Sequence, residues 1–128
     1  MKEVIIAEDE SMIRELIGLI CDGSGMSSIL CNDGSQALDL IKAGHVPDLL
    51  ITDGDMTSMG GIELMEKLRE LGFRFPVIFM TGRELVGNGR PLAEKIAGLT
   101  PYHLKKPFSV AALKELIARA LAEEAVTP

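Results

Sequence analysis

Two acidic residues directly follow an apolar segment in the middle of the chain. Residues 48–52 read Asp-Leu-Leu-Ile-Thr, and Asp53, Gly54 and Asp55 come next. A run of apolar and β-branched residues is typical of a strand buried on both faces. A carboxylate at the end of such a strand loses hydration, which is costly unless a cation or a hydrogen-bond donor compensates. Asp53 either begins a turn, a common role for Asp, or belongs to a ligand site at the end of the strand.

Three other apolar segments also end in polar residues. Glu8 and Asp9 follow residues 4–7, Thr81 follows residues 77–80, and Lys106 follows residues 102–105. Each has an ordinary structural explanation, because acids favour helix N-termini, Thr is common in strands and most lysines lie on the surface. If the strands are parallel neighbours, however, their ends meet at one edge of the sheet. The combination then predicts a crevice with three carboxylates, one hydroxyl and one ammonium.

The chemistry of this set of side chains favours phosphoryl transfer. Carboxylates placed close together repel each other, so at least one pKa should rise unless a cation is bound. Carboxylate oxygens suit Mg²⁺, which keeps several of its waters for a substrate phosphate. The carboxylate of Asp53 could attack phosphorus to give an aspartyl phosphate, with Thr81 and Lys106 neutralising the phosphoryl oxygens.

Strand and helix patterns alternate five times along the chain. The strand-like segments are residues 4–7, 28–31, 48–52, 77–80 and 102–105, and helical patterns begin at Ser11, after Gly34, after Gly61, near Leu92 and after Ser109. In the first helix, the apolar residues Ile13, Leu16, Ile17 and Ile20 have helical spacing. This alternation predicts an α/β, flavodoxin-like, doubly wound, five-stranded parallel sheet of order 2-1-3-4-5 with helices on both faces.

Composition narrows the classes of partner. The chain has 128 residues, 47% hydrophobic and 25% charged, which fits one globular domain over residues 1–124 with a frayed tail at 125–128. A net charge of −6 without a basic stripe argues against nucleic acid as a direct partner. No apolar run is long enough for a membrane span. We expect Cys21 and Cys31 to be buried free thiols in a cytoplasmic protein.

The sequence resembles the receiver domain of bacterial two-component response regulators over essentially the whole chain. The features that carry the resemblance are Glu8-Asp9, Asp53, Met56, Gly61, Thr81 and Lys106-Pro107-Phe108, in this order.

The resemblance implies a role for each candidate residue. Asp53 would accept the phosphoryl group. Asp9, Asp53 and the backbone carbonyl of Asp55 would ligate Mg²⁺ directly, Glu8 would act through a metal-bound water, and Thr81 and Lys106 would bind the phosphoryl group and carry the switch. The donor would be a phosphohistidine on a sensor histidine kinase or phosphotransfer protein. The output would go to a downstream protein or a tethered effector domain, with a phosphorylation-dependent homodimer as one form. The domain would not be an enzyme beyond slow self-phosphorylation and self-dephosphorylation.

The sequence departs from the family pattern at several places. Thr57 stands where the family usually has Pro, and Asp55 puts a second carboxylate beside the acceptor, which we expect to change the rate of phosphoryl loss. The loop between Thr81 and Lys106 is longer than usual and rich in Gly. At the position of the family's switch aromatic, three residues before Lys106, stands His103. Either a bulge restores Tyr102 to this position, or His103 fills it, or His103 is an ordinary surface residue.

Two other functional classes compete with this interpretation. Residues 53–57 also match the DxDxT pattern of haloacid-dehalogenase-like phosphatases, but there the DxDxT strand comes first in the chain and the acidic pair comes late, the reverse of this order. The other alternative is a receiver-like interaction module that works without phosphorylation.

Overall fold

The computed structural model describes residues 1–56, 58–82 and 90–126. The strands are β1 (Lys2–Ala7), β2 (Met26–Cys31), β3 (Leu49–Asp53), β4 (Val77–Thr81) and β5 (Tyr102–Lys105), and the helices are α1 (Ser11–Gly23), α2 (Gly34–Lys42), α3 (Gly61–Glu70), α4 (Arg90–Leu99) and α5 (Val110–Val126). The strands form one parallel sheet of order β2-β1-β3-β4-β5. The predicted fold is confirmed, and α4 is longer than the pattern near Leu92 indicated.

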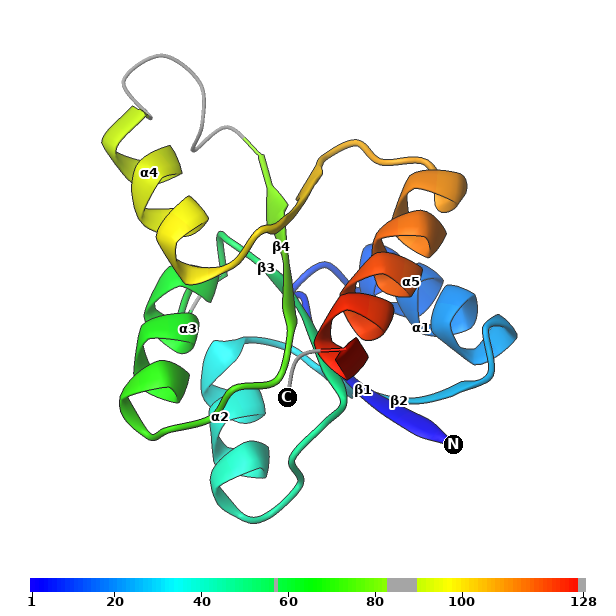
Figure 1. Cartoon of the computed structure of the whole chain (residues 1–128), viewed down its shortest axis with the longest axis horizontal. Coiled ribbons are helices and arrows are strands. Elements are labelled where there is room, and N and C mark those ends of the chain that lie inside the picture. Colours follow the sequence, from blue (N-terminus) through cyan, green and yellow to red (C-terminus); the bar gives the residue numbers. More distant parts are fainter. Residues whose placement is uncertain (57, 83–89, 127–128) are drawn as a thin grey trace.

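The sheet separates two hydrophobic clusters. Helices α1 and α5 cover one face, and α2, α3 and α4 cover the other (Figure 1). All five residues of β3 and of β4 are buried, as expected for central strands covered on both sides. Strand order reverses between β1 and β3, so the carboxyl ends of these neighbouring strands open the crevice in which such folds bind ligands.

Glycine at the start of α3 allows this helix to pack closely against the sheet. A Cβ atom at Gly61 would lie 2.4 Å from the carbonyl oxygen of Asp53 and 2.8 Å from Cε2 of Phe79. Gly61 also donates a backbone hydrogen bond to the carbonyl of Gly54. The short approach keeps the loop between β3 and α3 folded directly over the end of β3.

Helix α1 buries only some of its apolar residues. Ile17 and Ile20 are buried, but Leu16 is 43% exposed and Leu19 69% exposed. The residue that turns towards β2 is Gly18, where an added Cβ would lie 3.1 Å from Cδ2 of Leu30. Because α1 carries apolar residues around more than half of its circumference, their spacing alone could not select the face that packs.

Strand β5 places its first two residues on opposite faces of the sheet. Its register with β4 is regular and pairs Ile78 with Tyr102 and Thr81 with Lys105. His103 is therefore on the same face as Thr81, whereas Tyr102 is on the other face. The Tyr102 side chain is 2% exposed, and its hydroxyl donates a 2.9 Å hydrogen bond to Glu123 on α5.

Several other features bear on the predictions from sequence. Cys21 and Cys31 are buried free thiols, as expected. Among the described residues, no helix combines the length and apolar character that crossing a membrane requires. Helix α5 runs to Val126, and the rest of the predicted tail lies outside the described residues, as do Thr57 and the Gly-rich residues 87–89.

Candidate functional site

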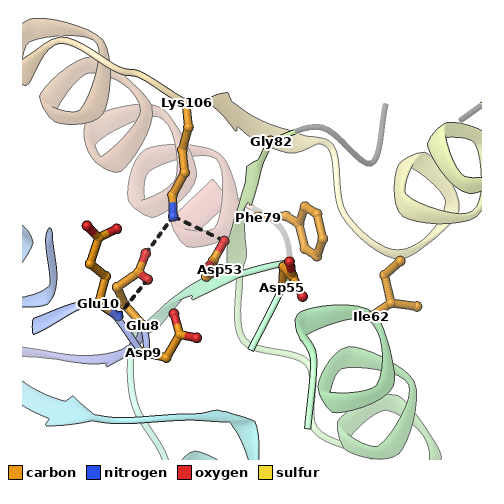
Figure 2. Close-up of a pocket in the computed structure, with 10 residues that line it drawn as sticks. Glu8, Asp9, Glu10, Asp53, Asp55, Ile62, Phe79, Gly82 and Lys106 are labelled. Carbon is orange, nitrogen blue, oxygen red and sulfur yellow. Dashed lines mark hydrogen bonds and ion pairs between the residues drawn. The ribbon is translucent and has the colours of Figure 1, made fainter. Parts of the chain in front are cut away.

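The ends of β1, β3 and β5 surround a pocket of about 760 Å³ (Figure 2). Charged side chains occupy one end, and apolar side chains lie at the other, from α3 and β4. The lining residues are Glu8, Asp9, Glu10, Asp53, Gly54, Asp55, Ile62, Phe79, Gly82 and Lys106. The pocket therefore lies at the switch point of the sheet, where the sequence predicted a crevice.

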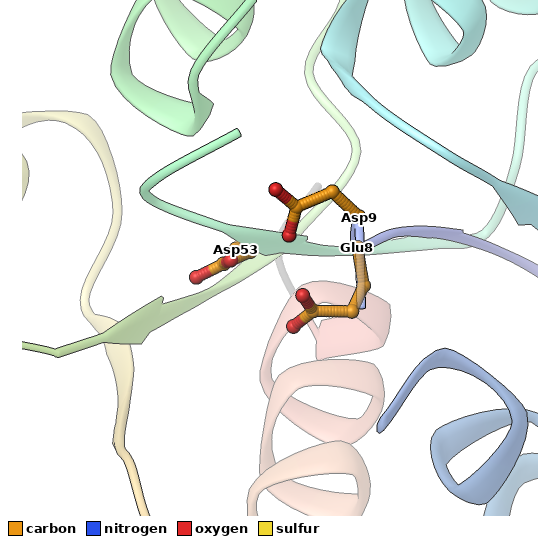
Figure 3. Close-up of side chains that lie close together, drawn as sticks. All are labelled: Glu8, Asp9 and Asp53. Carbon is orange, nitrogen blue, oxygen red and sulfur yellow. The ribbon is translucent and has the colours of Figure 1, made fainter. Parts of the chain in front are cut away.

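Three carboxylates converge in this pocket (Figure 3). Glu8, Asp9 and Asp53 each offer an oxygen, and these three oxygens lie within 4.8 Å of one another. Glu8 and Asp53 are buried, whereas Asp9 is exposed, so the group is open to solvent on one side. This arrangement offers a hard cation several oxygen ligands and leaves space for water.

Lys106 joins two of the carboxylates. Its Nζ donates to Oε1 of Glu8 at 2.8 Å and lies 3.2 Å from Oδ1 of Asp53 (Figure 2). Its backbone N–H donates to the carbonyl of Thr81 at 2.8 Å, which ties the residue after β5 to the end of β4. The ammonium therefore offsets part of the negative charge that Glu8 and Asp53 bring to the pocket.

Backbone contacts orient Glu8 towards the pocket. Its N–H donates to the carbonyl of Cys31 at 3.1 Å, and its carbonyl accepts from Nη1 of Arg14 at 2.8 Å. The carboxylate accepts from the N–H of Glu10 at 3.1 Å. These bonds fix both the main chain and the side chain, so Glu8 is held in place before any ligand arrives.

Burial controls the protonation of the pocket. It raises the pKa of Glu8 to about 7, although the hydrogen bond from Lys106 acts in the opposite direction. It also raises the pKa of Asp53, against the charge of Lys106. Burial by itself would lower the pKa of Lys106, but the hydrogen bond to Glu8 and the charge of Asp53 leave it above its usual value. A second cation in the pocket would favour the ionised carboxylates.

The metal-free protein should lose stability as the pH rises from about 5 to about 8. Across this range the folded state holds the Glu8 proton that the unfolded state has released, because the pKa of Glu8 is 4.5 without burial and about 7 with it. The free energy of unfolding therefore decreases with rising pH over this range. Urea unfolding at several pH values in the presence of a chelator measures it.

Glu8→Gln is the matched variant for this pH series, because it removes the titrating group and keeps the size of the side chain. Its free energy of unfolding should vary less with pH than that of the wild type. Equal slopes for the two proteins would contradict a dominant contribution from Glu8.

The structure brings together most of the residues that the sequence singled out. Glu8, Asp9, Asp53, Asp55 and Lys106 all line the pocket. Thr81 ends β4 with 3% of its surface exposed and is not among the described residues that line the pocket.

Sequence reasoning missed the apolar side of the pocket. Ile62 and Phe79 line it, but in the sequence they look like ordinary core residues of a helix and a strand. It also missed Arg14, which supports Glu8 from the first turn of α1. For Glu10, which also lines the pocket, the sequence did contain a signal, because Glu10 directly follows the acidic pair Glu8-Asp9.

Comparison with known proteins identifies the family. The family model for the response regulator receiver domain matches residues 4–118. "Response regulator MprA" of Mycobacterium avium (strain 104) is 34% identical over 119 residues, which cover 91% of this chain and 48% of that protein. The chain thus spans about half the length of the curated relatives it matches.

Solved structures agree with this assignment. The receiver domain of the Francisella response regulator 1452 has a TM-score of 0.80 and 27% identity, and the match covers 98% of this chain and 99% of that one. A receiver domain protein from Clostridium thermocellum has a TM-score of 0.85, with 98% of each chain covered. At 20% identity, this second likeness supports the fold alone.

Family, fold and acidic pocket lead to one assignment. The phosphatase alternative is set aside, because the family matched along nearly the whole chain is a phosphoacceptor signalling family and not an enzyme family. The acidic cluster lies where such a domain would carry its phosphorylation and metal site. The chain belongs to the response regulator receiver domain family of two-component signalling proteins.

Proposed function

We propose that Asp53 accepts a phosphoryl group from a phosphohistidine. The observation that carries this proposal is the position of its carboxylate, which lies at the end of β3, 3.2 Å from the ammonium of Lys106 and beside two further carboxylates. An oxygen of Asp53 attacks phosphorus, the phosphorus–nitrogen bond of the donor breaks, and the imidazole leaves with a proton from solvent. Lys106 stabilises the negative charge on the transferred group.

The acidic cluster has the donor set for Mg²⁺. Asp9 and Asp53 would hold the ion directly together with the backbone carbonyl of Asp55, and Glu8 would hold it through water. Carboxylate and carbonyl oxygens are the ligands that this hard cation prefers. Bound there, Mg²⁺ would neutralise the repulsion between the carboxylates and would supply positive charge for phosphoryl transfer.

Two further residues belong to the proposed switch. The Thr81 hydroxyl would bind the phosphoryl group after a movement of the end of β4, and Lys106 would exchange Glu8 for the phosphoryl group. Of the two switch candidates on β5, His103 is on the same face as Thr81, and its Nε2 is 2.7 Å from the carbonyl of Thr100. Tyr102 is directed to α5 by its bond to Glu123. We therefore propose that His103 occupies the switch position.

Partners follow from the proposed chemistry. A sensor histidine kinase or a phosphotransfer protein would supply the phosphohistidine, which places the domain in the cytoplasm, where kinases use ATP. Since the matched relatives are about twice as long, the output goes either to a tethered effector domain or to a separate protein. Phosphorylation-dependent dimerisation through α4, β5 and α5 is a further part of this proposal. The proposal includes no direct contact between this domain and nucleic acid.

Incubation with acetyl phosphate followed by intact-mass spectrometry tests the proposal. We expect one added phosphoryl group that requires Mg²⁺. Beryllofluoride, which mimics an aspartyl phosphate, should bind under the same conditions, so that a rapidly hydrolysed adduct is not overlooked. The absence of both would favour the alternative, an interaction module that works without phosphorylation.

Asp55→Asn should change the lifetime of the phosphorylated state. Asp55 is exposed and lines the pocket two residues after the acceptor, where its charge can repel or orient the water that attacks the acyl phosphate. We expect a change of about threefold or more in the rate of phosphoryl loss, since one nearby charge contributes about 1 kcal/mol in a partly solvated site. The decay of the phosphorylated mass measures it. An unchanged rate would show that this side chain plays no part in hydrolysis.

A further inference from the structure

The loop that carries Asp55 is attached to three different elements. At its start, the N–H of Gly54 donates to the carbonyl of Met80 on β4 at 3.2 Å. At its base, the N–H of Gly61 donates to the carbonyl of Gly54 at 3.2 Å. Its outer part contacts the beginning of α2, where the N–H of Gly34 donates to the carbonyl of Met59 at 3.1 Å. Hydrogen bonds therefore hold the loop at both of its ends and also at Met59, where it contacts α2.

The contact between α2 and Met59 requires glycine in the helix. A Cβ atom at position 34 would lie 2.6 Å from the carbonyl oxygen of Met59 and 3.1 Å from its Cβ and Cγ. The first atom belongs to the backbone, so it cannot rotate away as a flexible side chain would. The N–H at this position is available to Met59, because the first amides of a helix have no partner within the helix.

The beginning of α2 is itself fixed, which makes it a firm support. The Asp33 side chain caps the helix by accepting from the N–H of Gln36 at 3.0 Å. In return, Oε1 of Gln36 accepts from the N–H of Asn32 at 2.7 Å. A second bond joins the two segments, because the hydroxyls of Ser35 and Ser58 lie 2.6 Å apart.

We propose that Gly34 is a positioning residue for the metal site: it allows α2 to hold the loop that carries the carbonyl of Asp55, one of the ligands of the proposed site. This inference rests on the Mg²⁺ site proposed above. A side chain at position 34 would push Met59 outwards while the bond between Gly61 and Gly54 holds the base of the loop. The displacement would then fall on the residues between, among them Asp55, and a metal site tolerates only about 0.5 Å of such error.

Gly34→Ala is the test, and the readout is metal affinity, measured by calorimetry with Mg²⁺ and with Ca²⁺. We expect Mg²⁺ binding to weaken about 10-fold, as for other residues that orient metal ligands. Mg²⁺ demands near-ideal octahedral geometry, whereas Ca²⁺ accepts flexible coordination. The ratio of the Ca²⁺ to the Mg²⁺ dissociation constant should therefore fall about threefold or more, which a general loss of stability would not cause.

The control is Gly98→Ala in α4, where an added Cβ meets no heavy atom within 4 Å. Both metal affinities should stay at the wild-type level. A second variant, Ser58→Ala, removes the bond to Ser35 without a clash, and should shift the ratio in the same direction by about twofold. If Gly34→Ala does not fold, Ser58→Ala tests whether the contact with α2 positions the metal site.

The outcomes separate this inference from the function on which it rests. If the wild type neither binds Mg²⁺ nor accepts a phosphoryl group, the proposed function fails. If the wild type does both, and Gly34→Ala and Ser58→Ala leave both affinities unchanged or weaken both metals equally, the positioning role of Gly34 is refuted.

Discussion

Asp53→Asn is expected to abolish phosphorylation by acetyl phosphate while the fold stays intact. Asn has nearly the same size as Asp and can still accept a hydrogen bond from Lys106, so the packing at the end of β3 is preserved. It lacks the anionic oxygen that attacks phosphorus. The removed carboxylate is buried and its pKa is raised, so the melting temperature should not fall. Intact-mass spectrometry and circular dichroism measure the two effects.

Asp55→Asn is the matched control for this experiment. It makes the same chemical change two residues away, on a side chain that lines the same pocket. This variant should still gain one phosphoryl group. If Asp53→Asn were labelled at the wild-type rate, the acceptor would be another residue, and the proposed role of β3 would be wrong.

Asp9→Asn should weaken Mg²⁺ binding by about 10- to 100-fold. Asp9 is the exposed member of the three carboxylates, so it can meet the ion from the solvent side of the pocket. Substitution removes a charged ligand while the neighbouring Glu8 and Lys106 keep their contact. Labelling by acetyl phosphate should fall in parallel, and high Mg²⁺ concentrations should restore part of it.

Asp39→Asn in α2 serves as the control for this second prediction, because it removes the same charge from an exposed position outside the pocket. Calorimetry should give the wild-type affinity for this variant. Equal affinities for Asp9→Asn and the wild type would remove Asp9 from the metal site.

The sequence predicts the fold and the core of the site for the same physical reason. Alternating strand and helix patterns require parallel strands, and parallel strands bring their carboxyl ends to one edge. A polar residue that directly follows a buried strand therefore has little freedom in where it lies. Glu8 and Asp9 follow β1, Asp53 ends β3 and Lys106 follows β5, and these residues meet in the structure as expected.

Tertiary structure alone decided on which face of the sheet a side chain lies and which distant segments are in contact. Tyr102 and His103 differ by one position in a strand, so only the register of β5 with β4 determines which one shares a face with Thr81. The hydrogen bond between Gly34 and Met59 joins segments about 25 residues apart, and no local pattern encodes this contact.

The protonation of Glu8 also depends on tertiary structure. Its raised pKa comes from burial beneath the surrounding elements, and burial is a property of packing, not of the neighbours in sequence. The sequence by itself thus determined which residues gather at the end of the sheet, because strand ends follow from local patterns and the crossover rules leave few strand orders. The folded structure decided how those residues are oriented, supported and charged, because these properties arise only when distant segments pack together.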